Sequence, residues 1–310
     1  MNDLYVVTGA GPVGWAVTEQ LVGQGSRVRL LTRSGSGPEH PLVERVSADV
    51  QDLAVVEPAL SGAAAVFHCI HGSSYTADAW RAELPGAEQT VMAAAGEAGA
   101  VVVFPESLYS YSEPERPMTE AGPREAQGGK RGVRTGLLRA REASATNTVT
   151  MVAGDFFGPR VRNSLGGERM VRPVVAGKKL WVIGSADQPH SFTFVPDLAA
   201  AMVHAAQTPQ LWNKIWHTPS VSAVTQRQLA TAFADAAGAA KPNVGAVPGW
   251  ALPALGLFSR DVRELAEMLY QFEKPFVMDS AASQVALGLQ PTPLTEAAAA
   301  TVAWWGNQGR

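Results

Sequence analysis

The chain has 310 residues, of which 46% are hydrophobic and 17% are charged, and its formal net charge is −3. This composition is typical of a globular enzyme with one large or two joined domains, and it gives no electrostatic case for nucleic acid. No apolar run reaches the roughly 18 residues that span a bilayer, so we expect no membrane contact. The single cysteine, Cys69, excludes an internal disulfide, and the first predicted strand leaves no room for a signal peptide. We therefore expect a cytoplasmic protein.

Residues 4–33 have the pattern of a dinucleotide-binding unit. A buried strand at 4–7 leads into the glycine-rich turn 8–14, a helix that breaks at 25–26, and a second strand at 28–31. In this context the G-x-G-x-x-G spacing favours phosphate binding over a purely structural glycine turn. Gly9 permits the tight turn, Gly11 lets the backbone approach a diphosphate, and Gly14 lets the helix pack closely on the strand. We expect the diphosphate at the helix N-terminus, held by Gly9, Gly11, Pro12, Val13 and Gly14.

The end of the second strand indicates which dinucleotide is bound. Chains that bind NAD usually carry Asp or Glu at this place, where it accepts hydrogen bonds from the ribose hydroxyls. Here the place is taken by Thr32 and Arg33. A guanidinium pairs well with a 2′-phosphate, and no carboxylate repels it. The sequence therefore predicts NADP, with NAD as the alternative if Arg33 is only a solvated charge.

Strands and helices then alternate as far as residue 153. The patterns predict strands at 45–48, 64–70, 101–104 and 149–153, and helices at 52–60, at 79–98 with an interruption near Pro85, and at about 132–145. This order predicts an α/β fold with a doubly wound parallel sheet of the Rossmann type. Ligands bind at the carboxyl ends of such strands, so one crevice should be lined by the loops that start at Gly9, Thr32, Asp49, Cys69, Ser107 and Gly154.

The second half of the chain changes character. It predicts a helix at 171–177, a strand at 180–183, a strand and helix at 191–204, a strand at 215–217, a helix at 225–238, an apolar segment at 250–258 and an alanine-rich helix that reaches 305. We expect a smaller C-terminal α/β substrate domain that covers the crevice. The predicted division is a nucleotide-binding domain at 1–160 with about 191–206, and a substrate domain at 161–190 and 207–310.

These motifs together resemble the extended short-chain dehydrogenase/reductase superfamily, of the NAD(P)-dependent epimerase/dehydratase type. The resemblance covers nearly the whole chain and is carried by 8–14, 48–52, 67–69, Ser107 with Tyr111, 117–120, 157–159 and 194–199. It implies that Asp49 and Val50 contact adenine, that Cys69 and Ile70 back the nicotinamide ribose, and that Gly154 and Asp155 run beside the nicotinamide. It also implies that substrate contacts begin near Arg160, Arg162 and Asn163.

The catalytic motif departs from the family pattern. The resemblance implies a Tyr-x-x-x-Lys pair at the start of the helix after residue 120, where the Tyr transfers a proton and the Lys holds the nicotinamide ribose. By spacing, Lys130 stands in place of the Tyr and Arg134 in place of the Lys, and no tyrosine lies between 112 and 270.

Three interpretations of this departure stay open. In the first, Lys130 or Tyr109 transfers the proton, Ser107 binds the substrate oxygen as the family's Ser or Thr does, and Arg134 holds the ribose. In the second, proton transfer is lost and cofactor binding remains. In the third, Lys130, Arg131 and Arg134 are only a solvated helix start.

Two functions follow. The first is an NADP-dependent oxidoreductase or epimerase that acts on a carbonyl or secondary alcohol of a small molecule, with a non-standard active site. The alternative is a catalytically impaired NAD(P)-binding regulatory or redox-sensing protein. We expect no metal site, because His68 and His71 lack further ligands. A homodimer through the two helices after the fourth and fifth strands is possible, since residues 93–95 and 137–138 are apolar.

Overall fold

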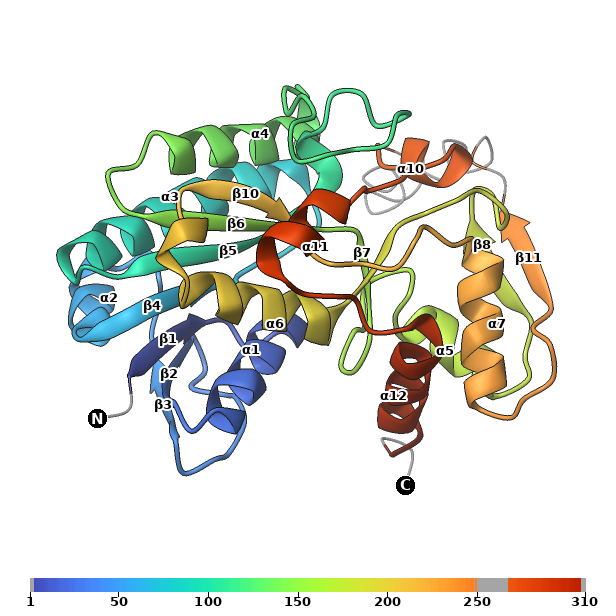
Figure 1. The fold of residues 1–310 in the computed structure, drawn as a ribbon, viewed down its shortest axis with the longest axis horizontal. Coiled ribbons are helices and arrows are strands. Elements are labelled where there is room, and N and C mark those ends of the chain that lie inside the picture. The colour runs from blue at the N-terminus through green and yellow to red at the C-terminus, as the bar shows by residue number, and fades with distance from the viewer. Residues whose placement is uncertain (1–2, 248, 250–266, 308–310) are drawn as a thin grey trace.

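The computed structural model describes residues 3–247, 249 and 267–307, and its centre is a seven-stranded parallel sheet (Figure 1). The strand order is β10-β6-β5-β4-β1-β2-β3, and every pairing is parallel. The order reverses at β1, which places the topological switch point between β1 and β4. The strands are β1 (Leu4–Thr8), β2 (Arg27–Thr32), β3 (Val43–Ser47), β4 (Ala63–His68), β5 (Val101–Ser107), β6 (Thr148–Ala153) and β10 (Lys214–His217).

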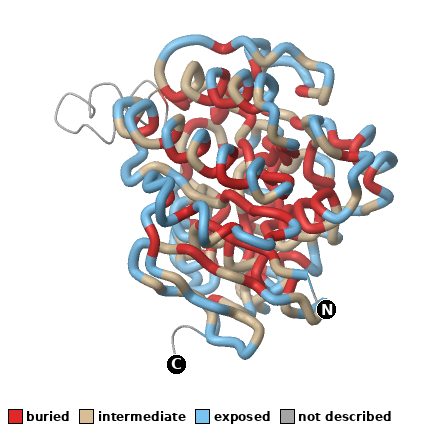
Figure 2. The backbone as a smooth tube through the Cα atoms, turned by 90° about the vertical axis from the view of Figure 1, so that its left-hand side faces the viewer, coloured by how far each residue is buried: buried red, intermediate tan, exposed pale blue. Residues whose placement is uncertain are grey.

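Helices cover both faces of this sheet, because alternate strand residues are apolar on both sides. On one face α1 (Pro12–Gly23) and α6 (Val195–Ala206) pack on Tyr5, Val7 and their neighbours. On the other face α2 (Leu53–Leu60) and α3 (Ala77–Glu97) pack on Val6 and Leu31, and α4 (Gly129–Glu142) packs beside α3. The buried residues gather along the sheet and the inner helix faces (Figure 2). The predicted doubly wound Rossmann-type fold is confirmed.

A smaller lobe follows β6 and has its own apolar core. Its first strand, β7 (Asp155–Phe157), pairs with β9 (Phe192–Phe194), and β8 (Leu180–Ile183) pairs with β11 (Val244–Val247). The helices α5 (Glu168–Val175), α7 (Gln226–Ala236) and α12 (Leu294–Asn307) surround that core. The short helix α10 (Tyr270–Glu273) lies near the end of β8, where the Phe272 oxygen accepts from Ser185 N, and α11 (Ala281–Leu287) returns to α6 of the large lobe (Figure 1). Short 3-10 helices lie at Leu108–Ser110 and Pro209–Leu211.

Several expectations differ from the structure. Pro85 does not interrupt α3, which is continuous because buried Trp80, Leu84 and Glu88 anchor the helix on both sides of the proline. Helix α4 begins at Gly129, earlier than expected. Strand β10 pairs with β6 in the large sheet, although the predicted range 207–310 assigns it to the substrate domain. The apolar segment 250–258 lies outside the described residues. In the part of the chain that is described, no helix is both long and apolar enough to cross a membrane.

Candidate functional site

The glycine turn after β1 is shaped by two close backbone approaches. Gly9 has φ +90°, and a Cβ on it would lie 2.9 Å from the carbonyl oxygen of Cys69. A Cβ on Gly14 would lie 2.0 Å from the carbonyl oxygen of Gly9, so only glycine lets α1 start this close to the strand. The turn is fixed by a hydrogen bond of 2.9 Å from Gly9 N to the Leu31 oxygen. The side chain of Val13 is buried in the core beneath it.

The outer side of the same turn is open. A Cβ on Gly11 would meet no heavy atom within 4 Å. Gly11 is the N-cap of α1, with Pro12 in the first turn, no capping side chain and no acidic residue there. The amide groups and positive end of the α1 dipole are therefore available to an anion. This cradle fits a diphosphate.

The loop after β2 carries hydroxyl groups and one exposed cation. Thr32 Oγ1 donates to the Ser36 oxygen at 3.0 Å, and Ser47 Oγ donates to the Arg33 oxygen at 2.9 Å. The Arg33 side chain is exposed. After β3, the Asp49 carboxylate accepts from the Gln51 amide at 3.0 Å, and Val50 is buried.

The residues after β4 close against the glycine turn. Cys69 N donates to the Thr8 oxygen at 2.9 Å, and Ile70 Cγ1 would lie 3.2 Å from a Cβ on Gly9. Burial raises the pKa of the Cys69 thiol well above its usual value, so the thiol stays protonated and is a poor nucleophile.

The residues after β6 are held by the returning chain. Gly154 N donates to Thr193 Oγ1 at 2.9 Å, and a Cβ on Gly154 would lie 2.3 Å from the Ser191 oxygen. The Asp155 carboxylate contacts His190 Nε2 at 3.0 Å, and His190 Nδ1 contacts the Gln271 oxygen at 3.0 Å. The His190 ring is stacked against Phe272 and Phe276. Sequence patterns gave no signal for His190, because the two hydrogen-bond partners of its ring, Asp155 and Gln271, lie 35 and 81 residues away.

Ser107 ends β5 and is held by its own neighbour. Its amide and hydroxyl both donate to Glu106 Oε1, at 2.8 and 3.2 Å. Glu106 is buried and its other oxygen accepts from Arg141 at 2.9 Å. Arg141 in turn binds both oxygens of the buried Glu88. The Ser107 hydroxyl is thus positioned by a charge network inside the protein.

Lys130 and Arg134 face the protein interior from the first turns of α4. Lys130 is 0% exposed, and its Nζ lies 2.8 Å from Glu267 Oε2. Arg134 is 7% exposed, lies 3.5 Å from Glu106, and stacks its guanidinium 4.7 Å from the Trp80 ring centroid. Arg131 donates to the Tyr111 oxygen at 2.6 Å. The interpretation of these residues as a solvated helix start is wrong, because their partners come from the interior and from the C-terminal segment.

A second tyrosine, Tyr75, lies beside Tyr109. The hydroxyls of Tyr75 and Tyr109 lie 2.8 Å apart, and Lys130 Nζ lies 4.9 Å from the Tyr75 ring centroid. Tyr75 comes from the loop between β4 and α3, and sequence reasoning missed it. The available signal was its position after a strand that ends at the ligand-binding edge of the sheet.

The three predicted substrate contacts differ in their surroundings: Arg160 is held by an ion pair, whereas Arg162 and Asn163 are exposed. Arg160 has φ +64°, pairs with Glu19 at 3.0 Å and stacks 4.5 Å from the Trp15 ring centroid. The structure therefore brings its guanidinium to α1. Arg162 and Asn163 are exposed.

Most of the residues expected at a dimer interface are buried within the single chain. Ala94, Ala95, Leu137 and Leu138 are at most 5% exposed in the single chain, so their apolar surface is already used in packing α3 and α4. Of the predicted residues only Ala93 is exposed.

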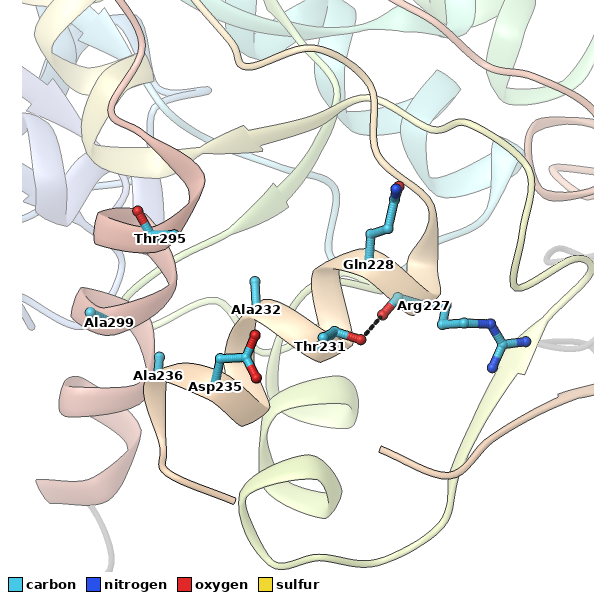
Figure 3. A pocket seen from close by; sticks show the side chains of 8 residues that line it. All are labelled: Arg227, Gln228, Thr231, Ala232, Asp235, Ala236, Thr295 and Ala299. Atoms are coloured by element: carbon cyan, nitrogen blue, oxygen red, sulfur yellow. Dashed lines mark hydrogen bonds between the residues drawn. The ribbon is translucent and has the colours of Figure 1, made fainter. Parts of the chain in front are cut away.

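Two surface hollows lie on other helices. One, of about 520 Å³, lies between α7 and α12 of the smaller lobe (Figure 3), and includes Arg227, Asp235 and Thr295. The other, of about 580 Å³, lies along α3 and α4 and includes Pro85, Gly132 and Gly136. Neither includes Gly11, Ser107 or Tyr75, so neither lies at the glycine turn or at the end of β5.

Comparison with solved structures identifies the same fold in enzymes that hold nucleotides. The Bordetella bronchiseptica enzyme WbmH in complex with NAD⁺ has a TM-score of 0.77 at 21% identity, with all of both chains covered. UDP-glucose 4-epimerase from Thermotoga maritima with UDP-glucose has a TM-score of 0.78 at 15% identity, covering 99% of this chain and 100% of that one. DesIV, a dTDP-glucose 4,6-dehydratase from Streptomyces venezuelae with NAD and TYD bound, has a TM-score of 0.76 at 19% identity, covering 99% of this chain and 98% of that one.

No curated protein sequence matches the chain. The model of one protein family matches residues 5–215, which span β1 to β10 and include the glycine turn, Ser107 and α4. The chain belongs to the NAD-dependent epimerase/dehydratase family.

Proposed function

We propose that the chain is an NADP-dependent oxidoreductase or epimerase that acts on a carbonyl or secondary alcohol of a small molecule. The observation that carries the proposal is the open cradle at Gly11, which lies on the same edge of the sheet as Ser107 and the Tyr75–Tyr109 pair. A diphosphate held at the first site directs the rest of a dinucleotide along that edge. Similar folds hold NAD and UDP-glucose, which supports a nucleotide cofactor and a small-molecule substrate.

The family cofactor supplies a hydride-transferring nicotinamide. We assign its diphosphate to Gly9, Gly11, Pro12, Val13 and Gly14, and its adenosine to Thr32, Arg33, Asp49 and Val50. We assign its nicotinamide ribose to Cys69, Ile70 and Arg134, and its nicotinamide to Gly154 and Asp155. The side chains of the protein then have to bind the substrate oxygen and exchange a proton with it. The single O–H of Ser107 is donated to Glu106 in this structure, so the hydroxyl has to rotate away from Glu106 to donate to the substrate oxygen, while the Ser107 amide remains bound to Glu106.

The preference for NADP rests on charge. Arg33 is an exposed cation at the end of β2, and the nearby hydroxyls of Thr32, Ser34 and Ser36 form a polar loop. We expect Arg33→Ala to weaken NADPH binding about 10- to 100-fold, the value of one charge-assisted contact, and to leave NADH binding unchanged. Quenching of tryptophan fluorescence measures both affinities. Arg116→Ala is the control, because Arg116 is an exposed arginine in a distant loop.

The proposed function is tested with NADPH and a panel of aldehydes and ketones, and with NADP⁺ and a panel of nucleotide sugars. Oxidation of NADPH by at least one carbonyl class, or conversion of a sugar to its epimer, is the expected result. If NADPH raises the melting temperature but the whole panel is untouched, the enzymatic proposal is overturned. If neither dinucleotide raises the melting temperature at millimolar concentration, the cofactor assignment fails as well.

The second candidate is a cofactor-binding regulator without turnover. It is favoured by the ion pair between Lys130 and Glu267, since by sequence spacing Lys130 stands in place of the family's catalytic tyrosine. The two functions differ in the fate of the bound cofactor. A regulator binds NADPH and leaves it reduced, whereas an enzyme oxidises it when substrate is added.

A further inference from the structure

The phenol of Tyr75 lies at the carboxyl-terminal edge of the sheet, where ligands bind in folds of this type. Its ring packs edge-on against Trp80, with centroids 5.4 Å apart, and lies parallel to His71 at 6.4 Å. The residue is nevertheless 39% exposed. Its hydroxyl is tied at 2.8 Å to that of Tyr109, which follows Ser107 by two residues. The Tyr75 phenol is therefore held in place and also open to a ligand.

A buried cation lies over this ring. Lys130 Nζ is 4.9 Å from the ring centroid of Tyr75. A cation at the ring face lowers the free energy of the phenolate relative to the phenol. The lysine that replaces a tyrosine on α4 thus lies at the ring face of a tyrosine supplied by another segment. The same ammonium is paired with Glu267, whose negative charge acts on the Tyr75 phenol in the opposite direction.

We propose that Tyr75 is the catalytic residue that exchanges the proton with the substrate oxygen, and that Lys130 and Tyr109 assist it. This inference rests on the proposed function. In carbonyl reduction the substrate carbon gains a hydride from the reduced nicotinamide, which is oxidised. The O–H bond of Tyr75 breaks and its proton forms the new O–H bond of the alcohol. The resulting phenolate takes a proton from solvent, either directly or through Tyr109, which regains its own proton from solvent. Oxidation of an alcohol reverses each transfer.

The other candidates for this role are less accessible. Lys130 is 0% exposed and its ammonium is engaged by Glu267, so it cannot reach a substrate oxygen in this arrangement. Tyr109 is partly buried, with its hydroxyl against Tyr75 and its ring stacked over Trp80. Tyr109 is therefore better placed to relay a proton to Tyr75.

The surroundings keep Tyr75 protonated at neutral pH. Burial raises the pKa of the Tyr75 phenol, and the hydrogen bond with Tyr109 acts in the opposite direction. The charged and titratable groups that face it are Lys130, Glu267, Asp155, His71, Tyr109 and Tyr270. A protonated phenol is the form that donates, so the site is suited to reduction of a carbonyl.

The test compares Tyr75→Phe with wild type. We expect kcat to fall about 10²- to 10⁴-fold, the typical value of general acid–base catalysis, while the Kd for NADPH measured by fluorescence stays unchanged. Tyr109→Phe should cause a smaller fall. Tyr5→Phe is the matched control, because Tyr5 lies in β1 and its hydroxyl accepts a hydrogen bond from Gln207 Nε2 at 3.3 Å.

A second readout needs no cofactor. Tyrosinate absorbance of the free protein is titrated with base, and the difference between wild type and Tyr75→Phe isolates the Tyr75 phenol. Repeating the pair of titrations with Lys130→Met should move that ionisation to higher pH. This inference is overturned, while the proposed function stands, if Tyr75→Phe leaves kcat unchanged. It is also overturned if Lys130→Met leaves the pH of the Tyr75 ionisation unchanged. A wild-type protein that turns over no substrate overturns both.

Discussion

His68 is enclosed at the end of β4. It is 3% exposed, Nδ1 is 2.9 Å from Thr8 Oγ1, and Nε2 has no hydrogen-bond partner within the described chain. Burial is the main cause that lowers the pKa of His68 from 6.5 to about 4, with Glu88 opposing it and Arg141 and Arg134 adding to it. The neutral ring is therefore the folded form at neutral pH.

This burial predicts a loss of stability in mild acid. Between pH 6.5 and 4 the unfolded chain binds a proton at His68 that the folded chain does not, so the free energy of unfolding falls as pH decreases through this window. His68 should contribute a fall of about 2 kcal/mol between pH 7.5 and 5. Urea unfolding at the two pH values measures it. In His68→Asn the fall should shrink by this amount, and in the exposed His40→Asn it should not; equal falls in all three proteins would contradict the prediction.

Residues such as Lys130 also show where sequence reasoning ends. Its place in α4 and its departure from the family pattern were predictable from local spacing. Its partners were not, because Glu267 is 137 residues away and Tyr75 is 55 residues away. Charged side chains are usually solvated, and no feature of the sequence around Lys130 indicates that this lysine is buried. The ion pair of Arg160 with Glu19 was unpredictable for a related reason, since a local motif gives no information on a partner 141 residues away.

At the scale of elements, the prediction from sequence was accurate where local chemistry decides. The switch from strand to glycine turn to helix fixed β1, α1 and β2 to within a few residues, because Gly9 and Gly14 have few alternatives. Long-range packing decided the rest. Helix α3 passes through Pro85 because its inner face is anchored, and β11 (Val244–Val247) was not predicted because its strand character depends on pairing with β8.

The glycine turn offers a matched pair of substitutions. Gly11→Ala meets open space at a φ of −72°, so the free energy of unfolding should change by no more than about 1 kcal/mol. Its methyl group occupies the space assigned to the diphosphate, and NADPH affinity should fall about 10- to 100-fold as charge-assisted contacts are lost. Gly14→Ala instead collides with the Gly9 oxygen and should cost about 1–3 kcal/mol of stability.

Thermal melts with and without NADPH separate the two effects. Gly11→Ala should melt like wild type alone and gain less from NADPH, whereas Gly14→Ala should melt lower in both conditions. Gly86→Ala on α3, which also meets open space, is the control. Full NADPH stabilisation of Gly11→Ala would refute the position assigned to the diphosphate.

At the scale of the whole molecule, the fold could be predicted because it repeats one pattern. Alternating strands and helices permit few topologies, and the order of β1 to β6 follows from them. The boundary between the lobes could not be predicted, since the chain after residue 160 crosses between them more than once. Strand β10 returns to the large sheet, and the segment at 288–293 reaches back so that Thr292 binds Asp197 of α6 at 2.6 Å.

The ion pair between Lys130 and Glu267 connects α4 of the large lobe to the C-terminal segment. Lys130 is fully enclosed, whereas the Glu267 side chain is 29% exposed, so part of the attraction is screened by solvent. Glu267→Gln keeps the shape but leaves the ammonium facing a neutral amide. We expect the free energy of unfolding to fall by about 1–3 kcal/mol, the cost of weakening a charge-assisted contact in a buried setting.

Urea unfolding of Glu267→Gln measures this cost, and Glu168→Gln is the control. Glu168 forms an exposed pair with Arg172 one turn away on α5, where side-chain exposures are 30% and 54%, and such pairs contribute about 0.3–0.5 kcal/mol. If the two variants lose the same small amount, the Lys130–Glu267 pair does not connect the lobes energetically. If Glu267→Gln also raises the KM for substrate while Glu168→Gln does not, the contact holds the C-terminal segment over the crevice, because weaker attachment reduces the fraction of molecules ready to bind.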